Sequence, residues 1–224
     1  MELKQIAYIL TDFDEKFGIP RQSGRVPELI GRIVFLPEYA VKEAVRGIED
    51  FTHLWLIFDF DKAHRDTFTP TVRPPRLGGN KKMGVFATRS PYRPNPIGLS
   101  SVKLIKVDYD TKYGLSLLVS GVDLLNNTPI YDIKPYLPSS DCHVDAKGGF
   151  ADEFTDYALN VDFNDDLLKI IPKDKQCALI KCLQDDPRPS YQTDDRVYTM
   201  KYINYDVKFS VYGDTLKVID VKIL

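Results

Sequence analysis

The chain has 224 residues, of which 43% are hydrophobic and 28% are charged, and its formal net charge is −2 at neutral pH. This composition is typical of a globular protein and excludes intrinsically disordered and collagen-like chains. The N-terminal segment lacks the basic region of a signal peptide, and no apolar run approaches membrane-spanning length. We therefore expect a cytoplasmic protein without membrane association.

Seven short strands and one helix are predicted in the first part of the chain. The strands are expected at Leu3–Leu10, Arg32–Leu36, His53–Phe60, Met83–Thr88, Gly98–Tyr109, Tyr113–Ser120 and Thr128–Tyr136. A helix is expected after Pro37, because apolar residues recur at helical spacing from Ala40 to Ile48. The continuous apolar run around Trp55 indicates a strand buried on both faces, with this tryptophan in the core.

On the strand from Gly98, the residues expected to point outward are Ser100, Lys103 and Lys106. Many short strands with one helix favour a single β-barrel or a strongly curved sheet. No GxGxxG motif follows a strand and opens a helix, which argues against a Rossmann-type nucleotide-binding fold.

An acidic segment separates this part from the rest of the chain. Residues Asp141 to Asp166 include eight Asp or Glu and only one Lys. Beyond it the sequence predicts a helix interrupted at Pro172, and then strands at Tyr198–Tyr212 and Thr215–Leu224 joined by a turn at Gly213. The prediction is a mainly β protein with a non-Rossmann barrel domain at residues 1–150 and a small α+β domain at residues 160–224. The second domain is small enough to depend on the first for stability.

The three cysteines are Cys142, Cys177 and Cys182, and no two of them form a CxxC pair. This pattern argues against a disulfide framework and a structural zinc site, and it fits a reducing compartment. Cys177 and Cys182 are expected in the core of the second domain. We predict no metal site.

Positive charge is concentrated between Lys62 and Lys106. This region holds ten Lys or Arg and one acidic residue, so the rest of the chain carries 20 basic and 31 acidic residues. Such a region is typical of a polyanion-binding surface, although a solvated basic loop would give the same count. Because apolar segments surround it, a folded surface is favoured over a tail.

Four motifs in these segments are unusually specific. They are PTVRPPRLGGN at 70–80, MGVFATRSPYRPNPIGLS at 83–100, VDLLNNTPIYDIKPYLP at 122–138 and QDDPRPSY at 184–191. Together they resemble the signature of the TsaA-like family, also called YaeB or TrmO. Its characterised members are S-adenosylmethionine-dependent tRNA methyltransferases.

The resemblance implies a homodimeric enzyme whose N-terminal barrel binds S-adenosylmethionine. It implies methylation of N6 of N6-threonylcarbamoyladenosine, beside the anticodon of threonine tRNA. The family's donor-binding positions match Pro20, Arg21, Gln22, Asp61, Lys62, Arg89, Leu99, Asp123, Leu124, Leu125 and Asn126. Two of these depart from the family pattern, since Asp61 replaces a common His and Asn126 replaces an acidic residue.

These residue types suit the donor chemically. Arg21 and Arg89 can each form a bidentate contact with the donor carboxylate, and Asp123 can bind the ribose hydroxyls or offset the sulfonium charge. Leu99 and Leu124 would wall the adenine. The alternative roles are an ion pair for Arg89, a turn cap for Asp123 and ordinary core packing for the leucines.

The acceptor nitrogen must lose a proton, so a carboxylate or a water-bridged base is expected, with Asp132, Asp145 and Asp186 as unranked candidates. The residues expected to neutralise tRNA phosphates are Arg73, Arg76, Lys81, Lys82 and Arg93. Unstacked anticodon-loop bases can stack on Tyr92, Arg188 and Tyr191. Two alternatives remain: a donor-binding enzyme of the same fold with another acceptor, and a non-catalytic RNA-binding module.

Overall fold

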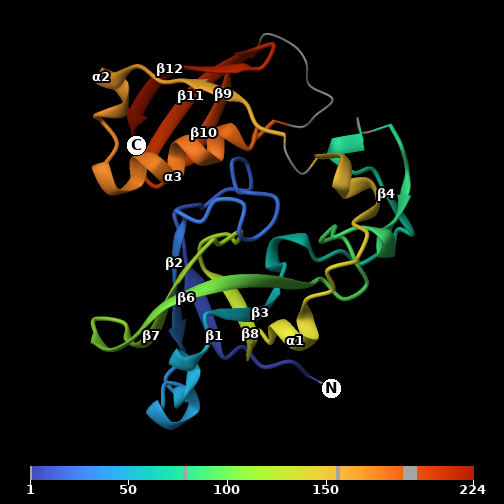
Figure 1. Cartoon of the computed structure of the whole chain (residues 1–224), viewed down its shortest axis with the longest axis vertical. Helices are drawn as coiled ribbons and strands as arrows, with labels where there is room; N and C mark the ends of the chain where they lie inside the picture. Colours follow the sequence, from blue (N-terminus) through green and yellow to red (C-terminus); the bar gives the residue numbers. More distant parts are fainter. Residues whose placement is uncertain (1, 78–79, 155–156, 189–195) are drawn as a thin grey trace.

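The computed structural model describes residues 2–77, 80–154, 157–188 and 196–224. Their regular structure is mainly β, as predicted, and it forms two larger sheets and a two-stranded ribbon. Figure 1 shows the two sheets one above the other, with the long connection that contains β4 projecting to one side. None of the helices in these residues is long and apolar enough to cross a membrane.

The N-terminal sheet contains six antiparallel strands, and each strand pairs with the next until the circle closes. The resulting barrel has the strand order β1-β2-β7-β6-β3-β8. Its strands are β1 (Ala7–Leu10), β2 (Ile30–Phe35), β3 (His53–Asp59), β6 (Ile97–Thr111), β7 (Gly114–Ser120) and β8 (Thr128–Pro135). Each lies within or close to a segment that the sequence predicts to be a strand.

Residues alternate across the barrel wall, as a strand with one buried face requires. In β3, Leu54 and Leu56 are fully buried inside, whereas Trp55 is only half-buried on the outer face. The Trp55 indole packs on Tyr136 and donates a hydrogen bond to Asp141, which lies in α1 (Pro138–Asp141). The prediction of a strand buried on both faces, with Trp55 in the core, is therefore wrong.

The predicted outward position of Ser100 is also wrong. Ser100 is 3% exposed and shares the inward face of β6 with Val102. Lys103 and Lys106 are exposed, as predicted. The register of β6 against β7 shifts between Leu104 and Lys106. Because of this irregularity, Lys106 faces outward although Ser100, six positions before it, faces inward.

The helix predicted after Pro37 is replaced by two short 3₁₀ helices, η1 (Lys42–Val45) and η2 (Ile48–Asp50). Gly47 between them has a φ of 85°, a left-handed conformation that interrupts any helix. Val41, expected on the apolar face, is 47% exposed. The apolar residues at helical spacing therefore do not form one continuous buried face here.

All six strands begin or end at one mouth of the barrel, and three connections leave from it: residues 11–29, 60–96 and 121–127. The longest connection contains η3 (Asp61–Ala63), η4 (Pro75–Leu77), η5 (Val85–Ala87) and the ribbon of β4 (Thr71–Val72) with β5 (Met83–Gly84). The strand predicted at Met83–Thr88 is thus a two-residue strand followed by a 3₁₀ turn.

After α1 and η6 (Gly149–Phe154), the chain forms a second sheet with the order β10-β11-β12-β9. Its elements are β9 (Asn160–Asp162), α2 (Asp165–Leu168), α3 (Lys173–Gln184), β10 (Tyr198–Tyr202), β11 (Tyr205–Tyr212) and β12 (Thr215–Ile223). The predicted break at Pro172 and the turn at Gly213 are confirmed. The single strand predicted at Tyr198–Tyr212 is instead a hairpin that turns at Ile203.

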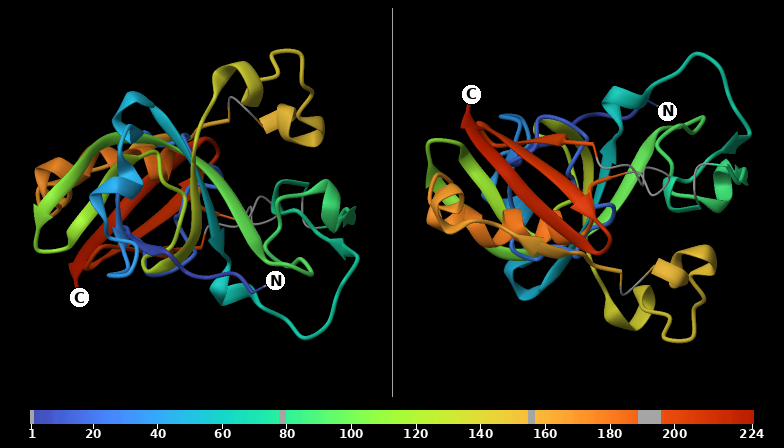
Figure 2. Two further views of the ribbon diagram at one scale, coloured as in Figure 1. Left: turned by 90° about the horizontal axis from the view of Figure 1, so that it is seen from below. Right: turned by 90° about the horizontal axis from the view of Figure 1, so that it is seen from above.

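Helix α3 buries Cys182 and exposes Cys177, so the core position predicted for Cys177 is wrong. The 11–29 connection joins the second sheet to the barrel, where Phe17 stacks on Tyr198 and Phe209. Asp12 in the same connection forms a 2.6 Å ion pair with Lys175 of α3. In the views of Figure 2, the 60–96 connection and the segment from α1 to η6 stand on the same side of these two sheets.

Candidate active site

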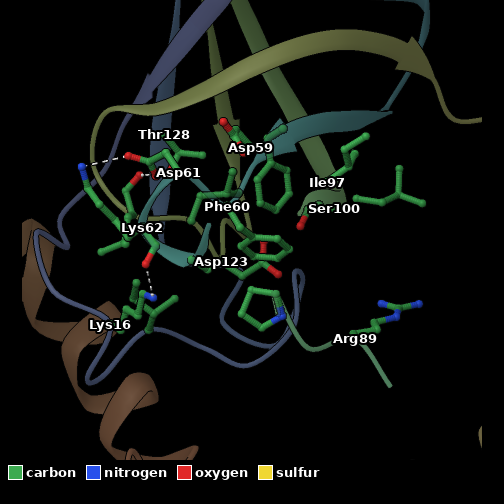
Figure 3. A pocket seen from close by; sticks show the side chains of 18 of the residues that line it. Lys16, Asp59, Phe60, Asp61, Lys62, Arg89, Ile97, Ser100, Asp123 and Thr128 are labelled. Atoms are coloured by element: carbon green, nitrogen blue, oxygen red, sulfur yellow. Dashed lines mark hydrogen bonds and ion pairs between the residues drawn. The ribbon is translucent and has the colours of Figure 1, made fainter. Parts of the chain in front are cut away.

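A cavity of about 540 Å³ occupies the mouth of the barrel. Its lining comes from the three connections and from the adjoining strand ends of β3, β6 and β8. Figure 3 shows Asp123 and Ser100 in its interior, with Arg89 on one side and Asp61 and Lys62 on the other. Ten of the eleven predicted donor-binding residues line it: Pro20, Arg21, Gln22, Asp61, Lys62, Arg89, Leu99, Asp123, Leu124 and Leu125.

Asp123 is the most unusual group in this cavity. Its Oδ1 atom is buried and has no hydrogen-bond partner among the described residues. Burial raises the pKa of Asp123 to about 6, although a hydrogen bond from Ser100 and the charge of Arg89 oppose the shift. A buried oxygen without a partner costs free energy, so this carboxyl group is ready to accept a hydrogen bond from a ligand.

The Pro20-Arg21-Gln22 turn forms a second wall. Gln22 accepts a hydrogen bond from Arg89, which is otherwise exposed. Arg21 is half-buried, and its Nη2 atom donates to the backbone carbonyl groups of Asp186 and Arg188. Burial lowers the pKa of Arg21. Arg89 is therefore the more available of the two arginines for a ligand carboxylate.

The remaining donor-binding candidates differ in position. Asp61, which stands where the family commonly has His, forms a 2.8 Å ion pair with its neighbour Lys62. Asn126 does not line the cavity. Its side chain donates to Asp14 and accepts from the backbone N–H of Thr11, so it holds the 11–29 connection in place.

A second, larger cavity of about 1320 Å³ adjoins the first and shares Arg21, Gln22 and Arg89 with it. It lies between the 60–96 connection, the segment around Phe150 and the residues that follow α3. The charged residues in its lining are seven basic ones (Lys16, Arg21, Arg25, Arg65, Arg73, Lys82 and Arg89) and two acidic ones (Asp185 and Asp186). This cavity suits an anionic ligand.

The predicted tRNA-binding residues are only partly brought together. Arg73 and Lys82 are exposed and line the larger cavity, and Lys81 is exposed beside it in the chain. Arg93 donates to the carbonyl groups of Val85 and Thr88 and thereby braces the loop. Tyr191 and the side chain of Arg76 lie outside the described part of the structure.

Arg188 and Tyr92, which are predicted to stack on RNA bases, both contact other residues of the chain. Arg188 is 8% exposed and forms a bidentate ion pair with Asp186 at 2.9 and 3.0 Å. Its guanidinium group therefore braces the chain after α3. The half-buried ring of Tyr92 is covered by Arg65, whose guanidinium carbon lies 3.6 Å from the ring centroid.

The candidate bases are also separated by the fold. Asp132 pairs with Lys134 on the outside of β8, and Asp145 is exposed in the turn after α1. Neither residue lines either of these two cavities. Asp186 does line the larger cavity, where it accepts hydrogen bonds from Arg188 and Tyr157.

Asp59 was missed by the sequence analysis. It ends β3 in the wall of the smaller cavity and accepts hydrogen bonds from Tyr131 at 2.8 Å and His64 at 2.7 Å. The available signal was an acidic residue at the end of an otherwise apolar strand. In the described residues, no group of three or more His, Cys, Asp or Glu could hold a metal ion.

Comparison with known proteins connects this arrangement to one family. The family model for the tRNA-methyltransferase O N-terminal domain matches residues 8–142, and the model for the TrmO C-terminal domain matches residues 157–223. The chain belongs to the TrmO family. The two matched regions contain the barrel and the second sheet.

Relatives within the TrmO family cover nearly the whole chain. The tRNA (adenine(37)-N6)-methyltransferase of Escherichia coli (strain K12) is 38% identical over 94% of this chain and 93% of its own length. A putative S-adenosylmethionine-dependent methyltransferase of Pseudomonas aeruginosa, RcsF, is 39% identical over 96% of this chain and 95% of its own length. A crystal structure of TrmO from P. aeruginosa superposes with a TM-score of 0.80 at 34% identity, covering 100% of this chain and 97% of that one.

Proposed function

We propose that this protein is a tRNA methyltransferase that transfers a methyl group from S-adenosylmethionine to N6 of N6-threonylcarbamoyladenosine beside the anticodon of threonine tRNA. The observation that carries the proposal is the pair of adjoining cavities that share Arg89. The smaller one has the mixed lining of a small-molecule site, and the larger one is cationic. A donor and an anionic acceptor can therefore meet at Arg89. The TrmO relatives support the reaction type, and the sequence motifs support the modified base and the tRNA.

The residues of the smaller cavity fit S-adenosylmethionine, which supplies an electrophilic methyl group on a sulfonium ion. The free Oδ1 atom of Asp123 can accept a hydrogen bond from the ribose or ammonium group of the donor. Leu99 and Leu124 provide apolar surface, and Arg89 provides a cation for the donor carboxylate. Positioning of the two reactants supplies much of the rate enhancement in such a site.

The acceptor nitrogen releases a proton as it is methylated, and a nearby carboxylate can take it. Among the three candidates from the sequence, only Asp186 lines the larger cavity. We therefore propose Asp186, acting directly or through a water molecule, as the proton acceptor. Its pairing with Arg188 holds the carboxylate in one orientation.

Three further parts of the proposal rest on the family resemblance and on the separation of the two sheets. These are a homodimer, a cytoplasmic location, and a division into a donor-binding domain at residues 1–150 and a second domain at residues 160–224. Sedimentation of the purified protein tests the first of them.

The donor assignment is tested by calorimetric titration with S-adenosylmethionine. Arg89→Ala should weaken binding about ten-fold or more, because it removes a charge-assisted contact with the donor carboxylate. Lys81→Ala is the matched control, since it removes an exposed cation that lines neither cavity. Equal losses in the two variants would contradict the role of Arg89.

The reaction is tested with tRNA that carries N6-threonylcarbamoyladenosine, followed by mass spectrometry of its nucleosides. We expect a gain of one methyl group on this nucleoside. Methylation of unmodified adenosine at the same rate would contradict the proposed acceptor, while donor binding without any transfer to tRNA would favour an enzyme with another acceptor.

A further inference from the structure

Two phenylalanines lie next to each other on the 60–96 connection. Phe68 is 55% exposed and Phe86 is 72% exposed. Their ring centroids are 6.3 Å apart and their planes differ by 23°, so the rings stack on each other while both remain open to water. Single exposed apolar residues are common, but two stacked and exposed aromatic rings form a flat apolar surface of the kind that binds a partner.

The backbone beneath Phe86 is held firmly. Phe86 belongs to η5, whose first residue, Val85, is 1% exposed and anchors the turn in the interior. The carbonyl oxygen of Val85 accepts hydrogen bonds from Arg93 at 3.0 Å and from the Thr88 hydroxyl at 2.9 Å. The backbone N–H of Val85 donates to the carbonyl oxygen of Pro70. The exposed position of Phe86 is therefore a feature of the fold, and its ring is presented without a large loss of chain entropy on binding.

The surroundings of this ring are cationic. The guanidinium carbon of Arg93 lies 5.6 Å from the Phe86 ring centroid. Phe86 lines the larger cavity together with Arg73 and Lys82, both of which are exposed. An aromatic face beside several cations matches unpaired RNA, in which flat bases alternate with phosphates.

We propose that Phe86, supported from one side by Phe68, is a stacking platform for an unpaired nucleobase of the tRNA loop. Arg73 and Lys82 bind the phosphates that flank this base. The platform and Arg89 line the same cavity, and Arg89 marks its junction with the donor cavity. The methylated nucleotide must reach that junction, so the base on Phe86 is a neighbour of the methylated one. This inference rests on the proposed function only in taking RNA as the acceptor.

The platform is tested with an anticodon stem-loop RNA that contains 2-aminopurine at an unpaired position next to the target nucleotide. The full-length protein should quench its fluorescence on binding. Phe86→Leu keeps an apolar side chain but lacks an aromatic face, so quenching should be lost and affinity should fall about ten-fold. Phe86→Trp should restore both. If Phe86→Leu quenches and binds like the unmodified protein, the platform is wrong.

Salt dependence separates stacking from charge. The slope of log affinity against log salt concentration should stay the same in Phe86→Leu and become shallower in Lys82→Ala, because only the lysine releases counterions from the RNA. A second copy of the chain is the competing occupant of the aromatic surface. Unchanged RNA binding in Phe86→Leu with an altered sedimentation coefficient would assign the surface to protein contacts and overturn the proposal.

Different measurements would contradict the stacking platform and the proposed function. RNA binding and quenching are measured without a methyl donor, so they report on the platform alone. Normal methyl transfer by Phe86→Leu at limiting RNA concentration would overturn the platform and leave the proposed function intact. Phe86-dependent binding without methyl transfer would do the reverse.

Discussion

Asp123 combines two properties that seldom occur together in a side chain with a purely structural role. It is a buried carboxyl group with a raised pKa, and one of its oxygens has no partner among the described residues. Structural carboxylates in protein interiors are usually paired or fully hydrogen-bonded. The free energy that this arrangement costs is consistent with a binding role.

The raised pKa of Asp123 has a defined effect on stability. The folded protein holds this proton up to a pH of about 6, whereas the unfolded chain releases it near 3.8. The contribution to stability is therefore complete below the lower value and is lost as the pH rises through the upper one. In urea unfolding without donor, the unmodified protein should lose about 3 kcal/mol of unfolding free energy relative to Asp123→Asn across this window.

Donor binding should show the opposite trend. The affinity of the unmodified protein for S-adenosylmethionine should rise with pH across the same window, because the ionised carboxylate is the better acceptor and the better counter-ion. The affinity of Asp123→Asn should be nearly flat. A stability difference that does not change with pH would contradict the assignment of this proton to Asp123.

Single residues also show where prediction from the sequence stops. The motif resemblance predicted most of the residues that line the smaller cavity. It could not distinguish Asp123, whose Oδ1 atom has no partner among the described residues, from Asn126, whose amide is hydrogen-bonded to Asp14 and Thr11. Arg188 lies in an apparently exposed Pro-rich motif and is nevertheless buried against Asp186. Such outcomes depend on contacts between residues that are distant in the chain.

Among the elements, the turn at residues 20–25 depends on the chain that follows α3. Arg25 forms a 2.6 Å ion pair with Asp185, whose side chain is 8% exposed, and Arg21 binds two carbonyl groups next to it. The segment that follows α3 thereby fixes one wall of the smaller cavity, although it contributes no strand to the barrel.

Asp185→Asn should weaken this wall. Loss of the charge opposite Arg25 should cost about 2 kcal/mol of unfolding free energy, which is less than for a fully buried pair because Arg25 is partly exposed. The Michaelis constant for the donor should rise several-fold with a smaller change in kcat. Asp162→Asn is the matched control, since its 4.0 Å pair with Lys217 is exposed on both sides. An unchanged Michaelis constant in Asp185→Asn would show that Asp185 does not hold this wall in place.

Element types were predicted well wherever burial followed a simple period, as in the six barrel strands and α3. The helix expected after Pro37 failed because the apolar spacing there has no facing surface, and Gly47 adopts a left-handed conformation. The inward position of Ser100 required knowledge of the barrel register, which no local pattern contains.

At the scale of the whole molecule, the two sheets share an interface built on the 11–29 connection. Gly18 has a φ of 99°, and a β-carbon at this position would overlap the side chain of Met200 in β10. The neighbouring Phe17 stacks on two aromatic rings of the same sheet. This close packing leads us to expect that the barrel and the second sheet unfold together.

Gly18→Ala tests that coupling. The added methyl group forces a strained backbone and a displaced Met200, so the free energy of unfolding should fall by about 2–4 kcal/mol. Trp55 is the sole tryptophan and lies on the outer face of the barrel, so its fluorescence reports on the part of the molecule away from the substitution. Fluorescence and far-UV circular dichroism should shift to the same lower midpoint, and two separate midpoints would show independent units.

Gly84→Ala is the control for this experiment, because a β-carbon there meets no atom within 4 Å and its φ of −57° suits any residue. Its midpoint should stay near that of the unmodified protein. The overall arrangement of the two sheets could not have been derived from the sequence, since Gly18 and Met200 carry no local sign of their contact.

The Arg25–Asp185 ion pair also affects when the fold can be completed during synthesis on the ribosome. The two residues are 160 positions apart, so a ribosome adding about 5–20 residues per second exposes Arg25 roughly 8 to 30 seconds before its partner exists. A nascent chain can close the barrel in that interval but lacks the contacts that hold residues 20–25 at the wall of the smaller cavity. Chains that end before Asp185 lack this ion pair, so the wall of the smaller cavity at residues 20–25 should be incomplete in them, and the proposed donor site should form only after Asp185 has been added.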